Sequence, residues 1–323
     1  MRGKLALVLS GGFVKGAAHI GFAKKLYEKR FFPDIFVGTS IGAIIAVALA
    51  SFDNPNIAEE KILAFIKKYL WPQYLSFDIT QKAGIFTSKQ IVNLIVKEFG
   101  LKNKKFSDLK KSVFITSTDL NSGKLLIFGP EYPAQIKNIL LSEAIEASIS
   151  FPVLFRPKKF VFEKNTLALS DGGIRENCPV TVAAKIPFVK KIIACDLGYF
   201  GQPKGDFNKK IFIEVFMQCL ELTTSFSQIN RYVNDEIFVK KKISLRIVNP
   251  GLFDIGPFEL NKANYAIKRA EETLEKLLSK YKSQRDFFKK WDNVRNTNNL
   301  KFVHLGQQKA NAFEIINFES IAD

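Results

Sequence analysis

Cysteine and histidine, the residues that most often build disulfide frameworks and zinc sites, are scarce in this chain. The sequence has 323 residues but only three cysteines and two histidines. Cys178, Cys195 and Cys219 are far apart and form no C-x-x-C pair. An odd number of scattered cysteines excludes a disulfide framework, and no obvious zinc site is present. Reduced thiols in a cytoplasmic protein are the resulting expectation.

Long apolar runs are also missing. The longest run, residues 41–52, is about twelve residues long, short of the roughly twenty that cross a bilayer. At the start of the chain, Arg2 and Lys4 precede an apolar stretch at 5–9, which resembles a secretory signal. That stretch is too short for a signal core and charge returns at Lys15, so we interpret it as a first strand. No transmembrane helix is predicted.

Acidic residues are outnumbered, with 31 Asp and Glu against 48 Lys and Arg, which gives a net charge of +17. A basic surface attracts any anionic partner, because the long-range field responds only to charge. The lysines occur in short groups without a dominant tract, as in an ordinary solvated surface. The functional alternative is peripheral contact with an anionic membrane, worth about 1 kcal/mol for each basic residue at the surface. Nucleic acid is not an expected partner.

Apolar residues make up 47% of the chain, enough for one large domain or two modest ones. Residues 5–9 form an uninterrupted apolar run, typical of a parallel strand that is covered on both faces. Short β-rich runs then alternate with segments of helical spacing, which predicts an α/β layer fold with a mostly parallel sheet. Strands are expected at 5–9, 35–37, 113–116, 125–128, 167–169 and 192–195, and helices at 15–30, 41–52, 57–69, 89–99, 142–147 and 261–281.

The apolar stripe of residues 261–281 fits either a core-facing closing helix or a dimer-forming one, so the oligomeric state stays open. Beyond residue 290 the pattern fades into polar, turn-rich sequence. We therefore divide the chain into a main domain, 1–285, and a C-terminal extension of unassigned role, 286–323.

The pentapeptide Gly38-Thr39-Ser40-Ile41-Gly42 is a G-x-S-x-G motif with an expected strand before it and a helix after it. A tight strand-to-helix turn exposes a serine hydroxyl above the sheet, and small flanking residues let the backbone pass. Ser40 is therefore a candidate nucleophile. The structural alternative is that Ser40 only caps the following helix.

A second glycine-rich segment, residues 10–16, lies between the first expected strand and helix. Backbone N–H groups at such a place suit an oxyanion, and in a doubly wound sheet this loop opens on the same edge as the Ser40 turn. A phosphate-binding P-loop is excluded, because Ala17 and Ala18 stand where it needs lysine and serine or threonine. The dinucleotide pattern fails too, since it needs glycine at Val14 and Ala17.

A serine nucleophile needs a base. His19 lies inside the first expected helix, where packing or bonding to a neighbour suits it better, and His304 lies in the weak terminal segment. A triad with His304 would require that tail to reach the site. Asp171 follows an apolar run and precedes Gly172 and Gly173, which fits a presented carboxylate and equally fits a plain Asp-Gly turn.

Five segments, in order, resemble the patatin-like phospholipase family from about residue 5 to 281. They are LSGGFVKGAAHIGF, FVGTSIGA, STDLNSG, ASISFPVLFRP and DGGIRENCPV. The resemblance implies a three-layer fold, helices on both faces of the sheet, and a Ser-Asp dyad that hydrolyses lipid esters without metal or organic cofactor. It implies Ser40 as nucleophile and Asp171 as general base in a phospholipase A or lysophospholipase.

The same resemblance assigns the oxyanion hole to the backbone amides of Gly11, Gly12 and Phe13. Lys15 matches the family's basic position and is expected to hold the loop or meet an anionic headgroup; Gly16 belongs to the same motif. Phe13 departs from the family, which usually has glycine there, and phenylalanine is costly at positive φ. The loop geometry therefore differs, or Phe13 supplies its N–H from an ordinary dihedral. Alternatively, Phe13 lines the acyl pocket, or the protein is a weak or inactive lipid-binding relative.

Overall fold

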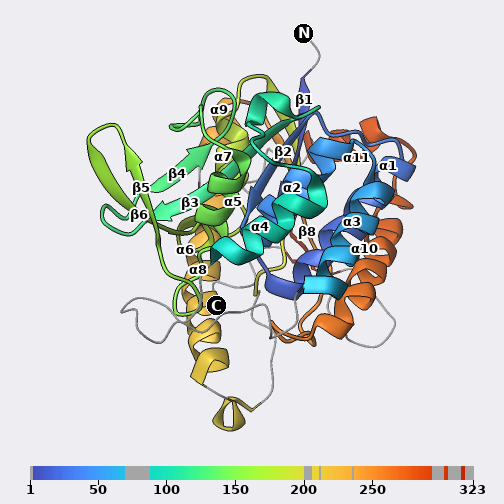
Figure 1. The fold of residues 1–323 in the computed structure, drawn as a ribbon. Coiled ribbons are helices and arrows are strands. Elements are labelled where there is room, and N and C mark those ends of the chain that lie inside the picture. Colours follow the sequence, from blue (N-terminus) through green and yellow to red (C-terminus); the bar gives the residue numbers. More distant parts are fainter. Residues whose placement is uncertain are drawn as a thin grey trace.

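A computed structural model describes residues 3–69, 88–199, 206–210, 212–234, 236–292, 302–304 and 314–316. One mixed sheet runs through its centre in the order β10-β9-β8-β7-β1-β2-β3-β6-β5, with β4 paired to β3 (Figure 1). The strands are β1 Lys4–Leu9, β2 Ile35–Thr39, β3 Ser112–Asp119, β4 Leu125–Phe128, β5 Lys158–Phe162, β6 Asn165–Asp171, β7 Val189–Cys195, β8 Ser244–Asn249, β9 Phe302–His304 and β10 Glu314–Ile316.

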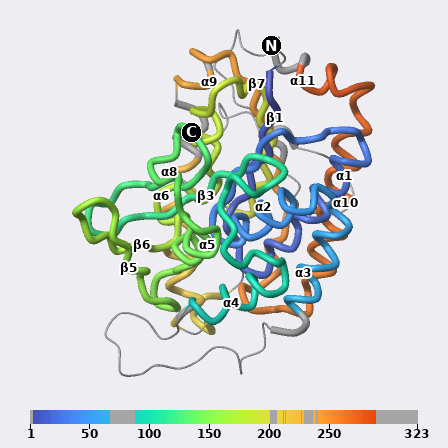
Figure 2. The backbone as a smooth tube through the Cα atoms, turned by 45° about the horizontal axis from the view of Figure 1, so that its top comes forward, coloured from blue at the N-terminus to red at the C-terminus, as the bar shows by residue number. Residues whose placement is uncertain are grey.

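Helices cover both faces of this sheet, as both views of the backbone show (Figures 1 and 2). One apolar cluster lies under α1, α2 and α10, and a second lies between the opposite face of the sheet and α7 and α9. The helices are α1 Ala18–Glu28, α2 Ile41–Phe52, α3 Pro55–Tyr69, α4 Ser88–Phe99, α5 Leu141–Ile149, α6 Gly173–Glu176, α7 Val180–Lys185, α8 Phe212–Asn234, α9 Ile237–Lys240, α10 Ala263–Leu278 and α11 Gln284–Asp292.

The parallel centre of the sheet positions the candidate site. β1 pairs in parallel with both β2 and β7, and Leu9 lies opposite Gly38 and Cys195 at the carboxyl ends of the strands. Antiparallel pairing is found toward both edges, where β6 joins β3 and β10 joins β9. The expected three-layer α/β fold is confirmed, and the sheet is mixed because its outer strands reverse direction.

The local predictions differ from the structure mainly at element boundaries. Helix 41–52 and strand 125–128 have the predicted limits, whereas the helix expected at 15–30 begins as a 3-10 turn, Phe13–Ala17, before α1. The sequence did not predict the strands β5, β8, β9 and β10, the long helix α8, or the shorter helices α6, α7, α9 and α11. The division at residue 285 stays a prediction; α11 spans it, and Phe287 and Phe288 pack in the core. Residues 293–301, 305–313 and 317–323 of the expected extension lie outside the described part.

Candidate active site

Ser40 lies on a strained turn between β2 and α2. Its backbone has φ 55° and ψ −126°, a conformation that non-glycine residues rarely adopt. The turn is held by close backbone packing: a Cβ on Gly42 would lie 2.2 Å from the carbonyl oxygen of Leu9, and one on Gly38 would lie 2.4 Å from that of Gly42. Glycine at both positions is therefore a steric requirement of the G-x-S-x-G turn.

The backbone of Ser40 is tied to α5 as well as to α2. Its N–H donates to the hydroxyl of buried Ser148 at 2.8 Å, and its carbonyl accepts from the N–H of Ala43 at 2.9 Å. No side-chain bond from Ser40 caps α2. The hydroxyl is thus free of the capping role that was its structural alternative.

Asp171 ends β6 and is buried, with 2% of its surface exposed. Its N–H donates to the carbonyl of Ser150 at 3.0 Å, and its Oδ1 accepts from the N–H of Gly173 at 2.7 Å. Gly172 passes close to Thr116 of β3, where a Cβ would lie 2.4 Å from the threonine hydroxyl. The aspartate turn is therefore fixed by backbone contacts, like the Ser40 turn.

Burial raises the pKa of Asp171 to about 6, while hydrogen bonding from the Ser40 hydroxyl and the Gly173 N–H lowers it by a smaller amount. The structure thus brings the side chains of Ser40 and Asp171 together. Oδ2 is buried and accepts no hydrogen bond of regular geometry, so it is the oxygen of this carboxylate that is still open to a donor.

Neither histidine lies where a base for Ser40 is needed. His19 is fully buried, and its Nε2 donates to the carbonyl of Ser10 at 2.8 Å. Burial lowers the pKa of His19 to about 4, so the ring is neutral and supports the glycine-rich loop. The backbone of His304 pairs with Asn249 of β8. Four strand spacings separate β9 from β2, about 19 Å.

The glycine-rich loop contacts the aspartate segment through Asn177. The N–H of Gly11 donates to the carbonyl of Asn177 at 3.1 Å, and Asn177 Nδ2 donates back to the carbonyl of Gly11 at 3.5 Å. The Gly11 amide is therefore engaged in this structure, and its expected role as an oxyanion donor stays a prediction. The amides of Gly12 and Phe13 remain as candidates.

Phe13 has φ 52°, in the left-handed region that glycine adopts most readily, so the expectation of an ordinary dihedral at this position is wrong. Its ring packs edge-on against Phe151 at 4.9 Å and Phe258 at 5.9 Å between centroids. Such pairs each stabilise by about 0.5–1.5 kcal/mol, which offsets the roughly 1–2 kcal/mol cost of the backbone conformation. The ring contacts thus allow a phenylalanine at a positive φ.

Lys15 holds the other side of the loop. Its buried ammonium group donates to the carbonyl of Leu197 at 3.3 Å and to Glu221 of α8 at 3.5 Å. These contacts favour loop support among the two expected roles, and the role itself stays a prediction. Gly16 follows in the 3-10 turn and lies against Ile41, where a Cβ would be 2.3 Å from its side chain.

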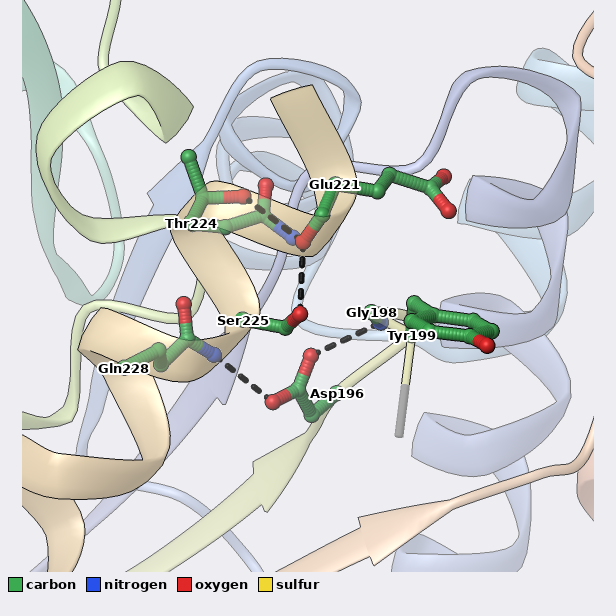
Figure 3. A pocket seen from close by; sticks show the side chains of 8 residues that line it. Asp196, Gly198, Tyr199, Glu221, Thr224, Ser225 and Gln228 are labelled. Carbon is green, nitrogen blue, oxygen red and sulfur yellow. Dashed lines mark hydrogen bonds between the residues drawn. The ribbon is translucent and has the colours of Figure 1, made fainter. Parts of the chain in front are cut away.

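A small pocket with polar lining lies next to this loop, lined by residues that follow β7, by residues of α8 and by Asn177 of the aspartate segment (Figure 3). The carboxylate of Asp196 accepts from the Gly198 N–H at 2.9 Å and from Gln228 Nε2 at 2.7 Å. Gln228 in turn accepts from the N–H of Cys178 at 3.1 Å. Since its polar groups bond to one another, the pocket anchors α8 to the segment that carries Asp171.

A metal-binding cluster and a membrane-spanning helix are both absent from the described part of the chain. Its His, Cys, Asp and Glu side chains form no group of three or more that could hold a metal ion. In the same residues, none of the helices is both long and apolar enough to span a bilayer.

Sequence reasoning missed two supporting residues, Ser148 and Asn177. Ser148 lies in the segment ASISFPVLFRP and Asn177 in DGGIRENCPV, so both stand inside family motifs that were recognised as whole segments. The signal was present, but only the fold shows that Ser148 bonds the Ser40 amide and that Asn177 bonds the glycine-rich loop.

A family model, patatin-like phospholipase, matches residues 7–184. The chain belongs to the patatin-like phospholipase family. The matched range includes all five motifs, from the glycine-rich loop to the Asp171 segment.

Curated relatives match about half of the chain. YqhO of Bacillus subtilis is an uncharacterised protein, 30% identical over 55% of this chain and 66% of its own length. The patatin-like phospholipase domain-containing protein 6 of Homo sapiens is 27% identical over 60% of this chain and 13% of its own. The triacylglycerol lipase ptl3 of Schizosaccharomyces pombe is 26% identical over 48% of this chain and 34% of its own length. The matches thus span less than two thirds of these relatives.

Among solved structures, VipD from Legionella pneumophila is similar, with a TM-score of 0.46 and 14% identity over 87% of this chain and 67% of its own.

Proposed function

We propose that this protein is a lipid acyl hydrolase that cleaves fatty acyl esters of phospholipids or lysophospholipids through an acyl-serine intermediate. The observation that carries the proposal is the pairing of Ser40, on its strained turn, with the buried carboxylate of Asp171. Family membership supports the lipid ester as substrate class.

In the proposed reaction, Asp171 accepts the proton of the Ser40 hydroxyl as Oγ attacks the acyl carbonyl carbon. Negative charge develops on the carbonyl oxygen, where the amides of Gly12 and Phe13 stabilise it. The C–O ester bond then breaks, the alcohol leaves with the proton from Asp171, and the acyl group stays on Ser40. Water attacks this ester by the same route, giving the fatty acid and free Ser40.

The raised pKa of Asp171 suits this role. A carboxylate with a pKa of about 6 is mostly ionised at pH 7 and is a stronger base than an ordinary one with a pKa of 3.8. We expect kcat/KM of the free enzyme to fall as the pH drops below about 6, because protonated Asp171 cannot accept the Ser40 proton.

A fluorophosphonate probe tests the proposal directly, since it reacts covalently with an activated serine. Folded wild-type protein should be labelled, Ser40→Ala should not, and Asp171→Asn should be labelled at a rate lower on the order of 10⁴-fold. Equal labelling of wild type and Ser40→Ala would refute it. Thermal melting of each variant controls for folding.

The second candidate is a lipid-binding protein on the same fold without turnover, which the substitution of glycine by Phe13 favours. The φ of 52° at Phe13 supports the enzyme instead, because the amide follows the glycine-type backbone. Hydrolysis of a soluble short-chain ester that disappears in Asp171→Asn would exclude the binding-only candidate. Liposome binding with no hydrolysis of that ester would favour it.

A further inference from the structure

The N-terminal half of α8 presents an exposed apolar face. Phe212 is 74% exposed and Leu222 is 48% exposed, and Cys219 is also exposed. Half-buried Phe216 stacks on Phe212 with 6.4 Å between ring centroids. Spacings of three and four residues place these side chains on one side of the helix. We call these four residues the α8 apolar face.

This face projects beyond the candidate active site. Glu221 of α8 contacts Lys15 in the glycine-rich loop, and Gln228 contacts Asp196 at the end of β7. Phe212 lies nine residues before Glu221, roughly 13 Å farther along the helix axis at 1.5 Å per residue. Figure 1 shows this half of α8 extending past the carboxyl ends of the central strands.

A second exposed apolar side chain lies beside the glycine-rich loop. Phe258 is 50% exposed, and its ring packs on Phe13 of that loop. The segment that carries Phe258 also bonds the loop through its backbone, because the Val14 N–H donates to the carbonyl of Pro257 at 3.5 Å. Both the α8 apolar face and Phe258 are thus exposed next to elements that contact the glycine-rich loop.

We propose that the α8 apolar face and Phe258 form the surface that docks on an anionic lipid bilayer. The inference rests on the proposed function, because a lipid ester must reach Ser40 from a bilayer, and this surface leads to Phe13. The net charge of +17 attracts an anionic surface and repels a second copy of the chain, which disfavours a dimer contact.

The local charges predict how docking depends on salt. The lysines beside the α8 apolar face are paired: Lys209 with Asp206 at 3.6 Å and Lys210 with Glu214 at 2.9 Å. Attraction therefore comes from the whole chain, whereas apolar side chains retain the protein at the bilayer. Salt should weaken recruitment, and loss of apolar side chains should weaken it more.

Flotation with vesicles tests the docking surface. Ser40→Ala protein keeps the vesicles intact, and vesicles of phosphatidylcholine with phosphatidylglycerol should bind it better than phosphatidylcholine alone. Adding Phe212→Ser and Leu222→Ser should lower partitioning on the order of tenfold or more. The matched control is Phe32→Ser. Phe32 is 54% exposed in the loop before β2, so it lies at the amino end of this strand, whereas Ser40 follows its carboxyl end. Unchanged binding of the double variant, or equal loss in Phe32→Ser, would overturn the proposal.

Cys219 supplies a second, independent measurement. Cys178 and Cys195 are buried, so a thiol-reactive environment-sensitive fluorophore attaches at Cys219 without further mutation. Anionic vesicles should shift its emission to shorter wavelength, as expected for a probe that enters the bilayer interface. An unchanged spectrum under conditions where the protein floats with vesicles would place the docking surface elsewhere.

The activity on a soluble short-chain ester separates this inference from the proposed function. Phe212→Ser with Leu222→Ser should leave that activity unchanged in the protein with Ser40 intact, because neither side chain belongs to the site. Loss of vesicle binding with retained ester hydrolysis supports both proposals. Normal vesicle binding by the double variant in an active enzyme refutes the docking surface alone.

Discussion

The Ser40 turn and the glycine-rich loop each carry a non-glycine residue at positive φ, but they are held in different ways. The Ser40 turn is confined by backbone atoms of β1 and α2 and by one hydroxyl, that of Ser148. The glycine-rich loop is also held by backbone bonds, such as that from the Gly11 N–H, but it depends in addition on several side chains: that of Lys15 in the loop, those of His19 and Asn177 outside it, and the rings that contact Phe13.

This difference indicates which part of the site tolerates change. Backbone contacts cannot be removed by substitution, so the nucleophile position is rigid as long as small residues stay at Gly38 and Gly42. The loop depends on several side chains, each of which can be replaced. We therefore expect a single substitution in the turn to lower stability and activity together, and a single substitution in the loop to lower activity with a smaller loss of stability.

The largest effect is expected for Gly42→Ala. The new methyl would lie 2.2 Å from a backbone oxygen of Leu9, so the turn must move, with an expected loss of roughly 3 kcal/mol in the free energy of unfolding and about 10²-fold in kcat/KM. Gly12→Ala is the control, because its methyl would meet the flexible side chain of Leu197 at 3.0 Å. Urea unfolding measures the stability of both variants. Equal losses of stability would show that the turn and the loop tolerate substitution equally well.

Asp171→Asn should stabilise the protein at high pH. The pKa of Asp171 is raised from 3.8 to about 6 by burial, so ionisation costs about 3 kcal/mol of stability, at about 1.4 kcal/mol per pKa unit. This cost is absent below pH 4, grows as the pH rises to about 6, and is constant above it. The variant should therefore unfold at higher urea concentration than wild type at pH 8 and at equal concentration near pH 4.

Asp119 is the matched control for this pH effect. It is also buried, but hydrogen bonds from Ser122 and Ala168 outweigh the effect of burial and lower its pKa. Its carboxylate stabilises the fold above its unfolded pKa, and that contribution is lost as the pH falls. Asp119→Asn should thus destabilise the protein at pH 8, and a gain in both variants would contradict the assignment of Asp171.

Lys15→Met should lower kcat about 10- to 100-fold with little change in KM, because the loop loses its contacts with Leu197 and Glu221 and the amides of Gly12 and Phe13 shift. Steady-state kinetics on a soluble ester measure the two constants. Lys15→Arg, which keeps the charge, should recover part of the rate. A rise in KM alone would instead indicate contact between Lys15 and substrate.

The smallest effect on stability is expected for Phe13→Gly. This variant loses two ring contacts, but glycine also avoids the energetic cost of the positive φ. Its free energy of unfolding should stay within about 1 kcal/mol of wild type. Phe13→Ala loses the same rings and keeps the backbone cost, so it should be the less stable variant. The opposite order in urea unfolding would show that Phe13 is not strained in the folded protein.

The amino-acid sequence by itself determined the alternation of elements, the Ser40 turn and the order of the family motifs. These follow from local rules: uninterrupted apolar runs form buried strands, and only glycine fits where Gly42 passes Leu9. The sequence left open the positions where one residue fitted two roles equally well. Asp171 was as consistent with a plain turn as with a base until the family motifs were considered.

Only the tertiary structure decided how the candidate site is assembled. It buries Asp171 beside Ser40, which raises the pKa of that carboxyl, and burial depends on segments more than 100 residues apart. It also shows that the Gly11 amide is engaged by Asn177, that Phe13 accepts positive φ, and that α8 contacts the glycine-rich loop. Hydrogen bonds and burial between distant segments leave no periodic pattern in the sequence, so they become visible only in the folded chain.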